Sequence, residues 1–393
     1  MYRAERLTEA GTLESLEHAV RLTPTNSDAW SRLGELLERR GDSAGAAGAL
    51  TRALELNRYD AGVWVNLALH WESEGDAKKA EQYLREAARV DGTFFPRWAL
   101  ANFYLRQEGP DQFWTAIRDA MSRNRADLPA AFELCWRAFD DVGEILEKAI
   151  PDLPEINRQY CQFLLETRRT AAVAGVWKRI AGQLQSADFP LARQYVNALL
   201  ADRQVDDAVQ VWNGLCQTGL VQFKPLDLAR GPLLTNGNFL VPPSALAFDW
   251  RVAEAEGVIG GVENSAGRPS LRLRLSGTHP ESIELLSQLA PAVERATYRV
   301  KYRYSTAGLP INTGLYWTIE DAAGGEKLLI TPPLAAQEDW KEDSTTFQTG
   351  PKTRLIRVIF AYRRSPGTTR VQGSVALTDV DLSPARRVRP VQP

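Results

Sequence analysis

The chain has 393 residues, which is long for a single core and suits two domains. Its formal net charge is −2, so bulk charge gives no attraction to nucleic acid or to an anionic membrane. No stretch approaches the roughly 20 apolar residues of a membrane-spanning helix, and the first residues lack the apolar core of a signal peptide. The three cysteines, Cys135, Cys161 and Cys216, have no metal-ligand spacing and are predicted to be buried free thiols.

A tryptophan returns every 34 residues near the N-terminus, at Trp30, Trp64 and Trp98. Glycine recurs in the same frame, where a helix must stop and the chain must turn through a conformation that glycine adopts at low cost. These glycines are Gly41, Gly75 and Gly109. The pattern resembles the tetratricopeptide repeat (TPR), a helix–turn–helix unit of that length. By the same resemblance, residues 12–25 match the second helix of an earlier copy.

Helical periodicity continues after the recognisable copies, over residues 131–149, 154–166, 170–184, 191–201 and 205–216. We therefore predict a TPR-type α-solenoid over residues 1–225. The first helix of the earliest copy would precede Met1, so we expect a missing N-terminal segment, where an export signal or membrane anchor would lie.

After a predicted linker at 226–233, the periodicity changes from helical to alternating. Leu271, Leu273 and Leu275 alternate with arginines, and residues 298–304 alternate in the same way. Further strands are predicted at 314–320, 327–330, 340–348, 354–363 and 374–382. Many short strands separated by turns are typical of an antiparallel sandwich, which we place at 234–384, followed by a basic, proline-rich tail at 385–393.

Four motifs in this order resemble the jelly-roll, galactose-binding-like modules, and among them the carbohydrate-binding modules. They are residues 234–239 (LTNGNF), Trp250, residues 285–288 and residues 375–382 (VALTDVDL). The resemblance implies a jelly-roll fold and allows for a structural calcium ion held by acidic side chains. Asn238, Leu240 and Thr378 replace acidic residues of the pattern while Asp379 and Asp381 remain, so we expect no firmly bound cofactor.

The TPR resemblance implies a groove for a partner peptide, lined by the first helix of each pair. The family's groove positions correspond here to Glu35, Glu38, Asn66, Leu69, Glu72, Phe103 and Arg106. Their acidic character argues against the cationic clamp that some members use for a C-terminal carboxylate. The alternative interpretation is a solvated helix face.

A glycan site in the sandwich would need exposed aromatic rings, on which the apolar face of a sugar can stack. The candidates are Tyr316, Trp317, Trp340 and Tyr362. Tyr316 and Trp317 are neighbours in a strand and must point to opposite faces, so at most one of them is exposed on a given face. Trp250, Tyr302 and Tyr304 are predicted to lie in the core.

Several cations are predicted to project from one sheet, namely Arg272, Arg274, Arg299, Lys301 and Arg303, with Arg357 as a sixth. The favoured interpretation is pairing with acidic side chains of neighbouring strands or of the solenoid. The functional alternative is contact of Arg299, Lys301 and Arg303 with an anionic polysaccharide or an acidic partner.

Catalysis has little support, because the sequence has no nucleophile elbow, phosphate-binding loop or HExxH zinc motif, and no nucleic-acid-binding motif. We predict a non-enzymatic bacterial scaffold whose solenoid binds a protein partner and whose sandwich binds a glycan. The resemblances suggest a role in assembly or export of cell-surface polysaccharide, in the periplasm, with a cytoplasmic location as the alternative. The other hypotheses are a purely structural scaffold without sugar contact, and a glycan-active enzyme with carboxylates between the domains.

Overall fold

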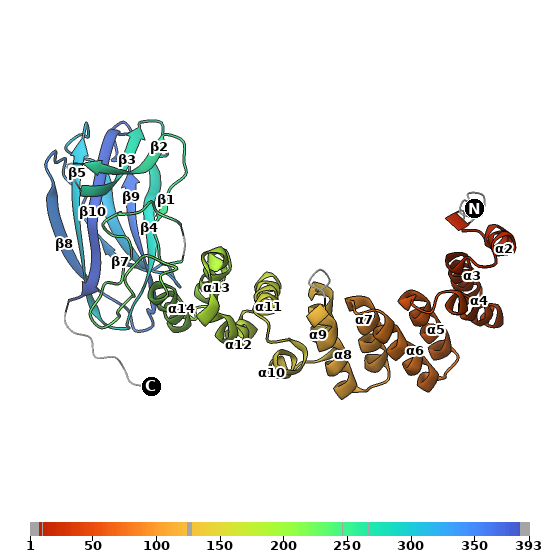
Figure 1. Cartoon of the computed structure of the whole chain (residues 1–393). Coiled ribbons are helices and arrows are strands. Elements are labelled where there is room, and N and C mark those ends of the chain that lie inside the picture. The colour runs from red at the N-terminus through yellow and green to blue at the C-terminus, as the bar shows by residue number, and fades with distance from the viewer. Residues whose placement is uncertain (1–7, 10, 124–127, 246, 266–267, 386–393) are drawn as a thin grey trace. The chain divides into compact units, whose positions relative to one another are not determined.

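The computed structural model describes residues 8, 9, 11–123, 128–245, 247–265 and 268–385 (Figure 1). The chain divides into two compact units, Met1–Gln183 and Leu184–Pro393, which are described here one at a time. All regular secondary structure described in the first unit is helical, and the second combines helices with two antiparallel sheets. A helical-repeat region followed by a β-sandwich is therefore confirmed. Among the described residues, no helix combines the length and the apolar character that crossing a membrane requires.

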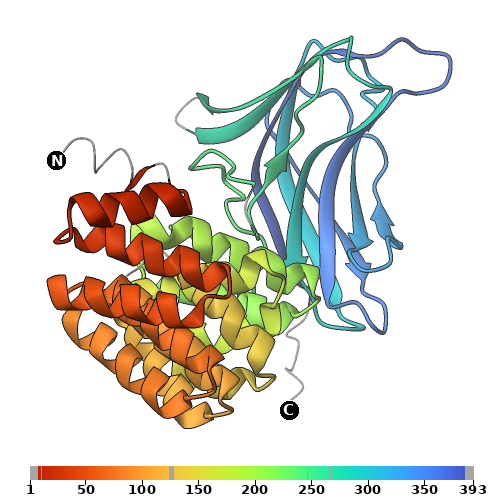
Figure 2. The ribbon, with the colours of Figure 1, turned by 90° about the vertical axis from the view of Figure 1, so that its right-hand side faces the viewer.

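The first unit is built from helices that pair in antiparallel fashion and stack side by side (Figure 2). They are α2 (Leu13–Leu22), α3 (Ser27–Arg39), α4 (Ser43–Leu56), α5 (Ala61–Ser73), α6 (Ala77–Val90), α7 (Phe94–Arg106), α8 (Pro110–Arg123), α9 (Leu128–Ala138), α10 (Val142–Glu144), the π-helix η1 (Ile145–Ala149), α11 (Pro154–Glu166), α12 (Thr170–Ile180) and the 3-10 turn η2 (Ala181–Gln183).

Short polar side chains fix where these helices begin. Asn26, Asp42, Asp60 and Asp76 stand just before α3, α4, α5 and α6, and each side chain accepts a hydrogen bond from a backbone N–H of the first helical turn. Such caps satisfy donors that have no partner within the helix.

The recurring tryptophans fix the loop before each first helix. Trp30 Nε1 donates to the carbonyl of Pro24 and Trp64 Nε1 donates to that of Arg58, both at 2.9 Å. In two successive repeats, the tryptophan side chain therefore donates to the carbonyl of the residue six positions before it.

Two details differ from the sequence prediction. The third copy turns at Glu108, with φ 54°, and Gly109 follows in an ordinary conformation, whereas Gly41 and Gly75 do adopt positive φ. The helix predicted at 131–149 is broken between α9 and α10, because Asp141 caps a new helix by accepting from the backbone N–H of Glu144. The earlier interpretation of 131–149 as one helix is wrong for this reason.

The second unit begins with helical segments and continues as two five-stranded sheets (Figure 1). The helical segments are the 3-10 turn η3 (Ser186–Asp188), α13 (Phe189–Ala201) and α14 (Val205–Gln217). The strands are β1 (Arg251–Val252), β2 (Val258–Ser265), β3 (Arg268–Ser276), β4 (Ser282–Pro291), β5 (Thr297–Ala307), β6 (Leu315–Asp321), β7 (Lys327–Ile330), β8 (Lys341–Gln348), β9 (Leu355–Arg363) and β10 (Gln372–Pro384). One sheet has the order β1-β4-β9-β6-β7 and the other β2-β3-β10-β5-β8.

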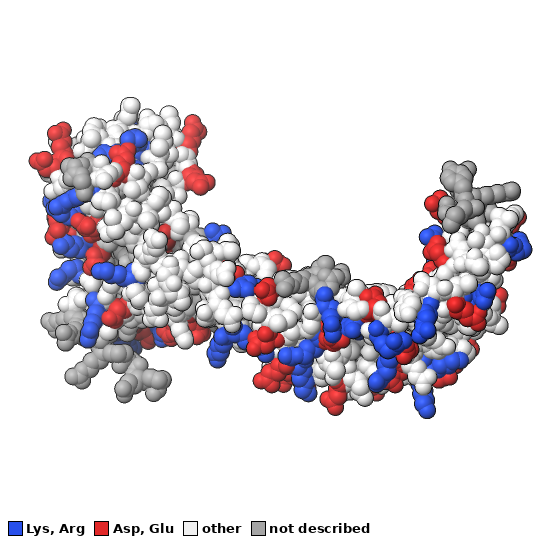
Figure 3. Space-filling model, viewed as in Figure 1, with Lys and Arg blue, Asp and Glu red and all other residues white. Residues whose placement is uncertain are grey.

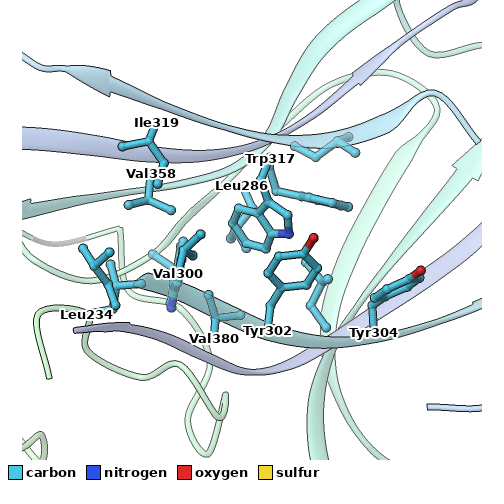
Figure 4. Packing of buried hydrophobic residues seen from close by; sticks show 14 of the residues in the cluster. Leu234, Leu286, Val300, Tyr302, Tyr304, Trp317, Ile319, Val358 and Val380 are labelled. Carbon is cyan, nitrogen blue, oxygen red and sulfur yellow. The ribbon is translucent and has the colours of Figure 1, made fainter. Parts of the chain in front are cut away.

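Large aromatic and aliphatic side chains fill the space between the sheets (Figure 4). Trp317 of β6 lies at its centre, with its ring centroid 5.3 Å from that of Tyr302 and 6.4 Å from that of Trp250. Tyr304 is also buried, so the prediction that Trp250, Tyr302 and Tyr304 are core residues is confirmed. The alternation of strands β3 and β5 thus places their apolar side chains in this core.

The segment that leads into the sandwich has no regular secondary structure and is held by buried polar side chains. Gln288 donates from Nε2 to the carbonyls of Thr235 and Phe248, at 3.1 and 2.7 Å. The buried carboxylate of Asp249 accepts from the backbone N–H groups of Ser244 and Trp250, both at 2.8 Å. Buried polar groups need such partners, so these bonds give the segment one conformation.

Helices α13 and α14 pack on this leading segment. Trp212 of α14 meets Phe248 edge to face, with ring centroids 5.8 Å apart, and Asn197 Oδ1 accepts from the backbone N–H of Ala247 at 3.2 Å. Within the stretch 226–233, Leu226 exchanges two hydrogen bonds with the Asn213 side chain. The last two helices therefore share a compact unit with the sandwich, although the change from helix to strand comes after them.

Candidate functional site

The predicted groove residues lie on the first helices of successive pairs, and hydrogen bonds join them across the repeats. Asn66 Nδ2 of α5 donates to Glu35 Oε1 of α3 at 2.8 Å. One repeat further on, Arg106 of α7 makes two bonds to the carboxylate of Glu72, at 2.8 and 2.7 Å. The bond to Glu72 raises the pKa of Arg106 above its ordinary value.

His70 is a member of this series that the sequence prediction missed. Its Nδ1 lies 2.7 Å from Glu38 Oε2, and the side chain is 2% exposed. The signal was present in the sequence, because His70 lies one helical turn after Asn66 and Glu38 lies three residues after Glu35. The carboxylates of Glu35, Glu38 and Glu72 therefore all have partners within the chain.

A small hollow of about 260 Å³ opens on this surface. Its lining residues are Glu35, Glu38, Arg39, Leu50, Asn66 and Leu69. Leu69 is 47% exposed there, so the hollow offers an apolar contact rimmed by polar groups. Phe103 is only 3% exposed, and its prediction as a groove contact is wrong because the ring packs inside the helical stack.

A larger hollow of about 690 Å³, which the sequence prediction missed, lies between α4 and α6. Trp64 and Tyr83 contribute its aromatic lining, with ring centroids 5.4 Å apart. Its rim carries both signs of charge, from Arg58, Lys79, Arg89, Glu55 and Glu86.

The sandwich carries a hollow of about 500 Å³ on the outer side of the sheet β1-β4-β9-β6-β7. The register explains it: Ala361 of β9 pairs with Glu284 of β4 on one side and with Tyr316 of β6 on the other. Side chains of these three residues point to the same face, and the small alanine stands between two long neighbours. The result is a depression with a half-buried tyrosine ring on one side and a carboxylate on the other.

Four charged side chains of this sheet form one connected network. Arg357 pairs with Glu284 and, at 3.2 Å, with Glu320, and Lys327 pairs with Glu320 as well. Two cations therefore balance two carboxylates. Arg363, which also lines the hollow, has no ion-pair partner among the described residues.

The prediction of exposed glycan-contacting rings is wrong for two of the four residues. Trp317 and Tyr362 are fully buried, because both point between the sheets from β6 and β9. Tyr316 faces outward and lines the hollow. Trp340 is half-buried, directly before β8. The sequence indicated that only one of Tyr316 and Trp317 faces outward. The pairing of β6 within its sheet makes Tyr316 the outward-facing residue.

The predicted cationic face lies on the other sheet, β2-β3-β10-β5-β8, and most of it is paired. Arg272 and Arg274 share Glu263 of β2. Lys301 pairs with Glu342 at 2.9 Å, and Arg303 pairs with Asp379 at 3.7 Å. Pairing with acids of neighbouring strands, the favoured interpretation, is thus observed for these four cations. On the faces that Figure 3 shows, Lys and Arg mix with Asp and Glu.

Two members of the predicted set behave differently. Arg357 belongs to the opposite sheet, so its inclusion in this face is wrong. Arg299 has no ion-pair partner among the described residues, and its neighbours across the strands are Thr346 and Ser383.

Asp379 and Asp381 do not form a calcium site with the described residues. Asp379 pairs with Arg303, and Asp381 accepts from Ser383 Oγ at 3.0 Å. No cluster of three or more His, Cys, Asp or Glu side chains suited to a metal occurs in the described part of the chain. Calcium needs six to eight oxygen ligands, which this pair with its cationic neighbour does not fit.

The thiols are poorly suited to nucleophilic chemistry. Cys135 and Cys161 are buried and Cys216 is half-buried, and all are free. Burial raises their pKa values to about 12, about 12 and about 11 respectively. Since the thiolate is the nucleophile, these groups are inert at neutral pH.

No protein-family model matches the chain, and no curated protein matches its sequence. Two similar solved structures are YrrB, a TPR protein with an unusual peptide-binding site, and PilF of Pseudomonas aeruginosa. YrrB is 12% identical with a TM-score of 0.27, and the match covers 52% of this chain and 93% of YrrB. PilF is 14% identical with a TM-score of 0.28, covering 55% of this chain and 92% of PilF.

A third similar structure is a CBM4 protein. It is 12% identical with a TM-score of 0.30, and the match covers 38% of this chain and 97% of that protein. Similarity at this level assigns no ligand, partner or role to the chain.

Proposed function

We propose that this chain is a non-enzymatic scaffold whose β-sandwich binds a saccharide and whose helical repeats bind a protein partner. The observation that carries the proposal is the row Glu284, Ala361 and Tyr316 across the hollow of about 500 Å³. Sugars bind to proteins by stacking an apolar face on an aromatic ring while planar polar groups hold the hydroxyls. Tyr316 supplies the ring, and Glu284, Ser282 and Thr318 supply polar groups beside it.

The chemistry of the hollow supports binding over cleavage. Glycoside hydrolysis uses two carboxyl groups that flank the scissile bond. Glu284 is the one carboxylate among the described residues that line the hollow, and it is engaged by Arg357. The wider role, in assembly or export of cell-surface polysaccharide outside the cytoplasm, rests on the sequence resemblances.

Saccharide binding is tested by screening the full chain and its Tyr316→Ala variant on a glycan array. We expect saturable binding to a defined glycan, weakened about fivefold in the variant, because a lost ring contact is worth about 1 kcal/mol. The control variant is Tyr59→Ala, which removes a tyrosine of the helical unit that is 71% exposed. It should bind the glycan as tightly as wild type does. Absence of binding by the folded chain, or equal binding by Tyr316→Ala, would contradict the proposal.

The protein partner is proposed to place an apolar side chain on Leu69, since the carboxylates around it already have partners. Peptides selected from a displayed library on the full chain should lose binding to Leu69→Asp. Leu22→Asp, which changes a leucine of similar exposure on α2, is the matched control. Selected peptides that distinguish neither variant from wild type would place the docking surface elsewhere.

A further inference from the structure

The hollow of the sandwich contains one guanidinium that nothing in the described chain neutralises. Arg363 is exposed at the end of β9, and its backbone neighbours are Ser282 of β4 and Gly314 before β6. Gly314 has φ 68°, and a Cβ there would lie 2.4 Å from the Arg363 carbonyl oxygen. The backbone thus requires glycine at this position, and the arginine has only small neighbours on both sides.

The other charges of the hollow have partners. Glu284 and Lys327 belong to the balanced network with Arg357 and Glu320. Arg364 pairs with Glu281 at 3.2 Å and donates to the Thr368 carbonyl at 2.8 Å. Arg363 therefore leaves the hollow with one positive charge in excess.

Arg363 and the ring of Tyr316 are spaced for a single sugar. Arg363 lies two residues beyond Ala361 on the same face of β9, and Tyr316 lies directly across from Ala361 on β6. Two residues along a strand span about 7 Å, and neighbouring strands lie about 5 Å apart. A pyranose ring stacked on Tyr316 can therefore direct a substituent at the guanidinium.

We infer that the saccharide is acidic and carries a uronic acid whose carboxylate binds Arg363. This inference rests on the proposed saccharide site. A planar guanidinium matches a carboxylate with two parallel hydrogen bonds, which gives both charge and geometric selectivity. On the opposite sheet the paired cations are satisfied within the chain, and Arg299 has Thr346 and Ser383 beside it, which offer no ring for stacking.

The test compares uronic acid oligosaccharides with their methyl esters, in which the carboxyl group has lost its charge and carries an added methyl group. Glucuronate, galacturonate, mannuronate and guluronate oligomers, sulfated glycans and neutral glycans are titrated into the full chain. Wild type should bind one acid at least about tenfold more tightly than its ester, a preference that added salt weakens. Arg363→Gln should remove the preference while retaining binding of the ester, and Arg299→Gln should keep the wild-type preference.

The outcomes separate the two proposals. Binding of neutral glycans only, or of acid and ester equally, would overturn the acidic assignment while saccharide binding stands, provided that Tyr316→Ala still weakens it. A preference for sulfated over uronic glycans would also overturn the assignment to a carboxylate. Absence of binding to every glycan would overturn the proposed saccharide function itself.

Discussion

His279 is buried in the turn between β3 and β4, where its ring meets Tyr362 edge to face at a centroid distance of 4.6 Å. Neither ring nitrogen has a hydrogen-bond partner among the described residues. Burial, assisted by the charge of Arg370, lowers the pKa of His279 below its ordinary value. The neutral form is therefore the form that this packing accommodates.

This burial predicts a loss of stability in mild acid. As pH falls below about 6.5, the ordinary histidine pKa, the unfolded chain takes up a proton that the folded chain still excludes. The free energy of unfolding should therefore decrease with falling pH until the lowered folded pKa is reached. His279→Phe keeps a ring against Tyr362, and His279→Gln removes it.

Denaturant midpoints of the three proteins, measured from pH 8 to pH 5, check this prediction. As pH falls, the denaturant midpoint of both variants should decrease less than that of wild type, whatever their stability at pH 8. If the midpoints of both variants decrease as steeply as that of wild type, His279 does not take up a proton on unfolding in this pH range.

At the scale of helices, two glycines in one pair have opposite environments. Gly34 of α3 faces Leu50 of α4 so closely that an added Cβ would lie 2.6 Å from the leucine Cγ. Gly48 of α4 is exposed, and an added Cβ would meet nothing within 4 Å. The first glycine sets how closely the helices pack, while the second only weakens its helix.

Substitutions at these glycines should therefore act in opposite directions. Gly34→Leu should lower the free energy of unfolding by about 1–3 kcal/mol, because the leucine forces the helices apart. Gly48→Ala should raise it by about 0.5–1 kcal/mol, since alanine restricts the unfolded chain and favours helix. Denaturant unfolding followed by far-ultraviolet circular dichroism gives both values. Destabilisation by both variants, or by neither, would contradict this account of the packing.

Strands illustrate which features of an element the sequence can predict. The alternation in β3 and β5 was sufficient to separate core from surface side chains, because successive residues of a strand point to opposite faces. The same alternation in β9 does not indicate to which sheet the strand belongs. The prediction therefore assigned Arg357 to the wrong sheet. Sheet membership depends on pairing with β4 and β6, which lie far from β9 along the chain.

At the scale of the whole molecule, the compact unit that contains the sandwich includes two helices. Trp212 is 1% exposed and packs on Phe248, and Asp206 accepts two bonds of 2.6 Å from Arg354. We predict that residues 184–393 unfold as one cooperative unit, and that the fragment 226–393 is markedly less stable because it exposes Phe248.

Single substitutions in the fragment 184–393 make the prediction quantitative. Trp212→Ala should lower its free energy of unfolding by about 3–5 kcal/mol, the usual loss for a buried aromatic side chain. Arg354→Gln removes only an exposed ion pair and should cost about 1 kcal/mol or less. If the fragment 226–393 is as stable as 184–393, the helices contribute nothing to the fold of the sandwich.

The sequence by itself determined the helical repeats, the change to strands and the core positions of Trp250, Tyr302 and Tyr304. These features follow from local periodicity and from turn and cap residues, which act between near neighbours in the chain. Only the tertiary structure decided that Tyr316 faces outward while Trp317 is buried, and that Glu38 is occupied by His70. It also decided that Arg363 has no carboxylate partner among the residues that the structure describes. Each of these depends on which distant strands and helices lie side by side, and the local pattern of the sequence does not contain that information.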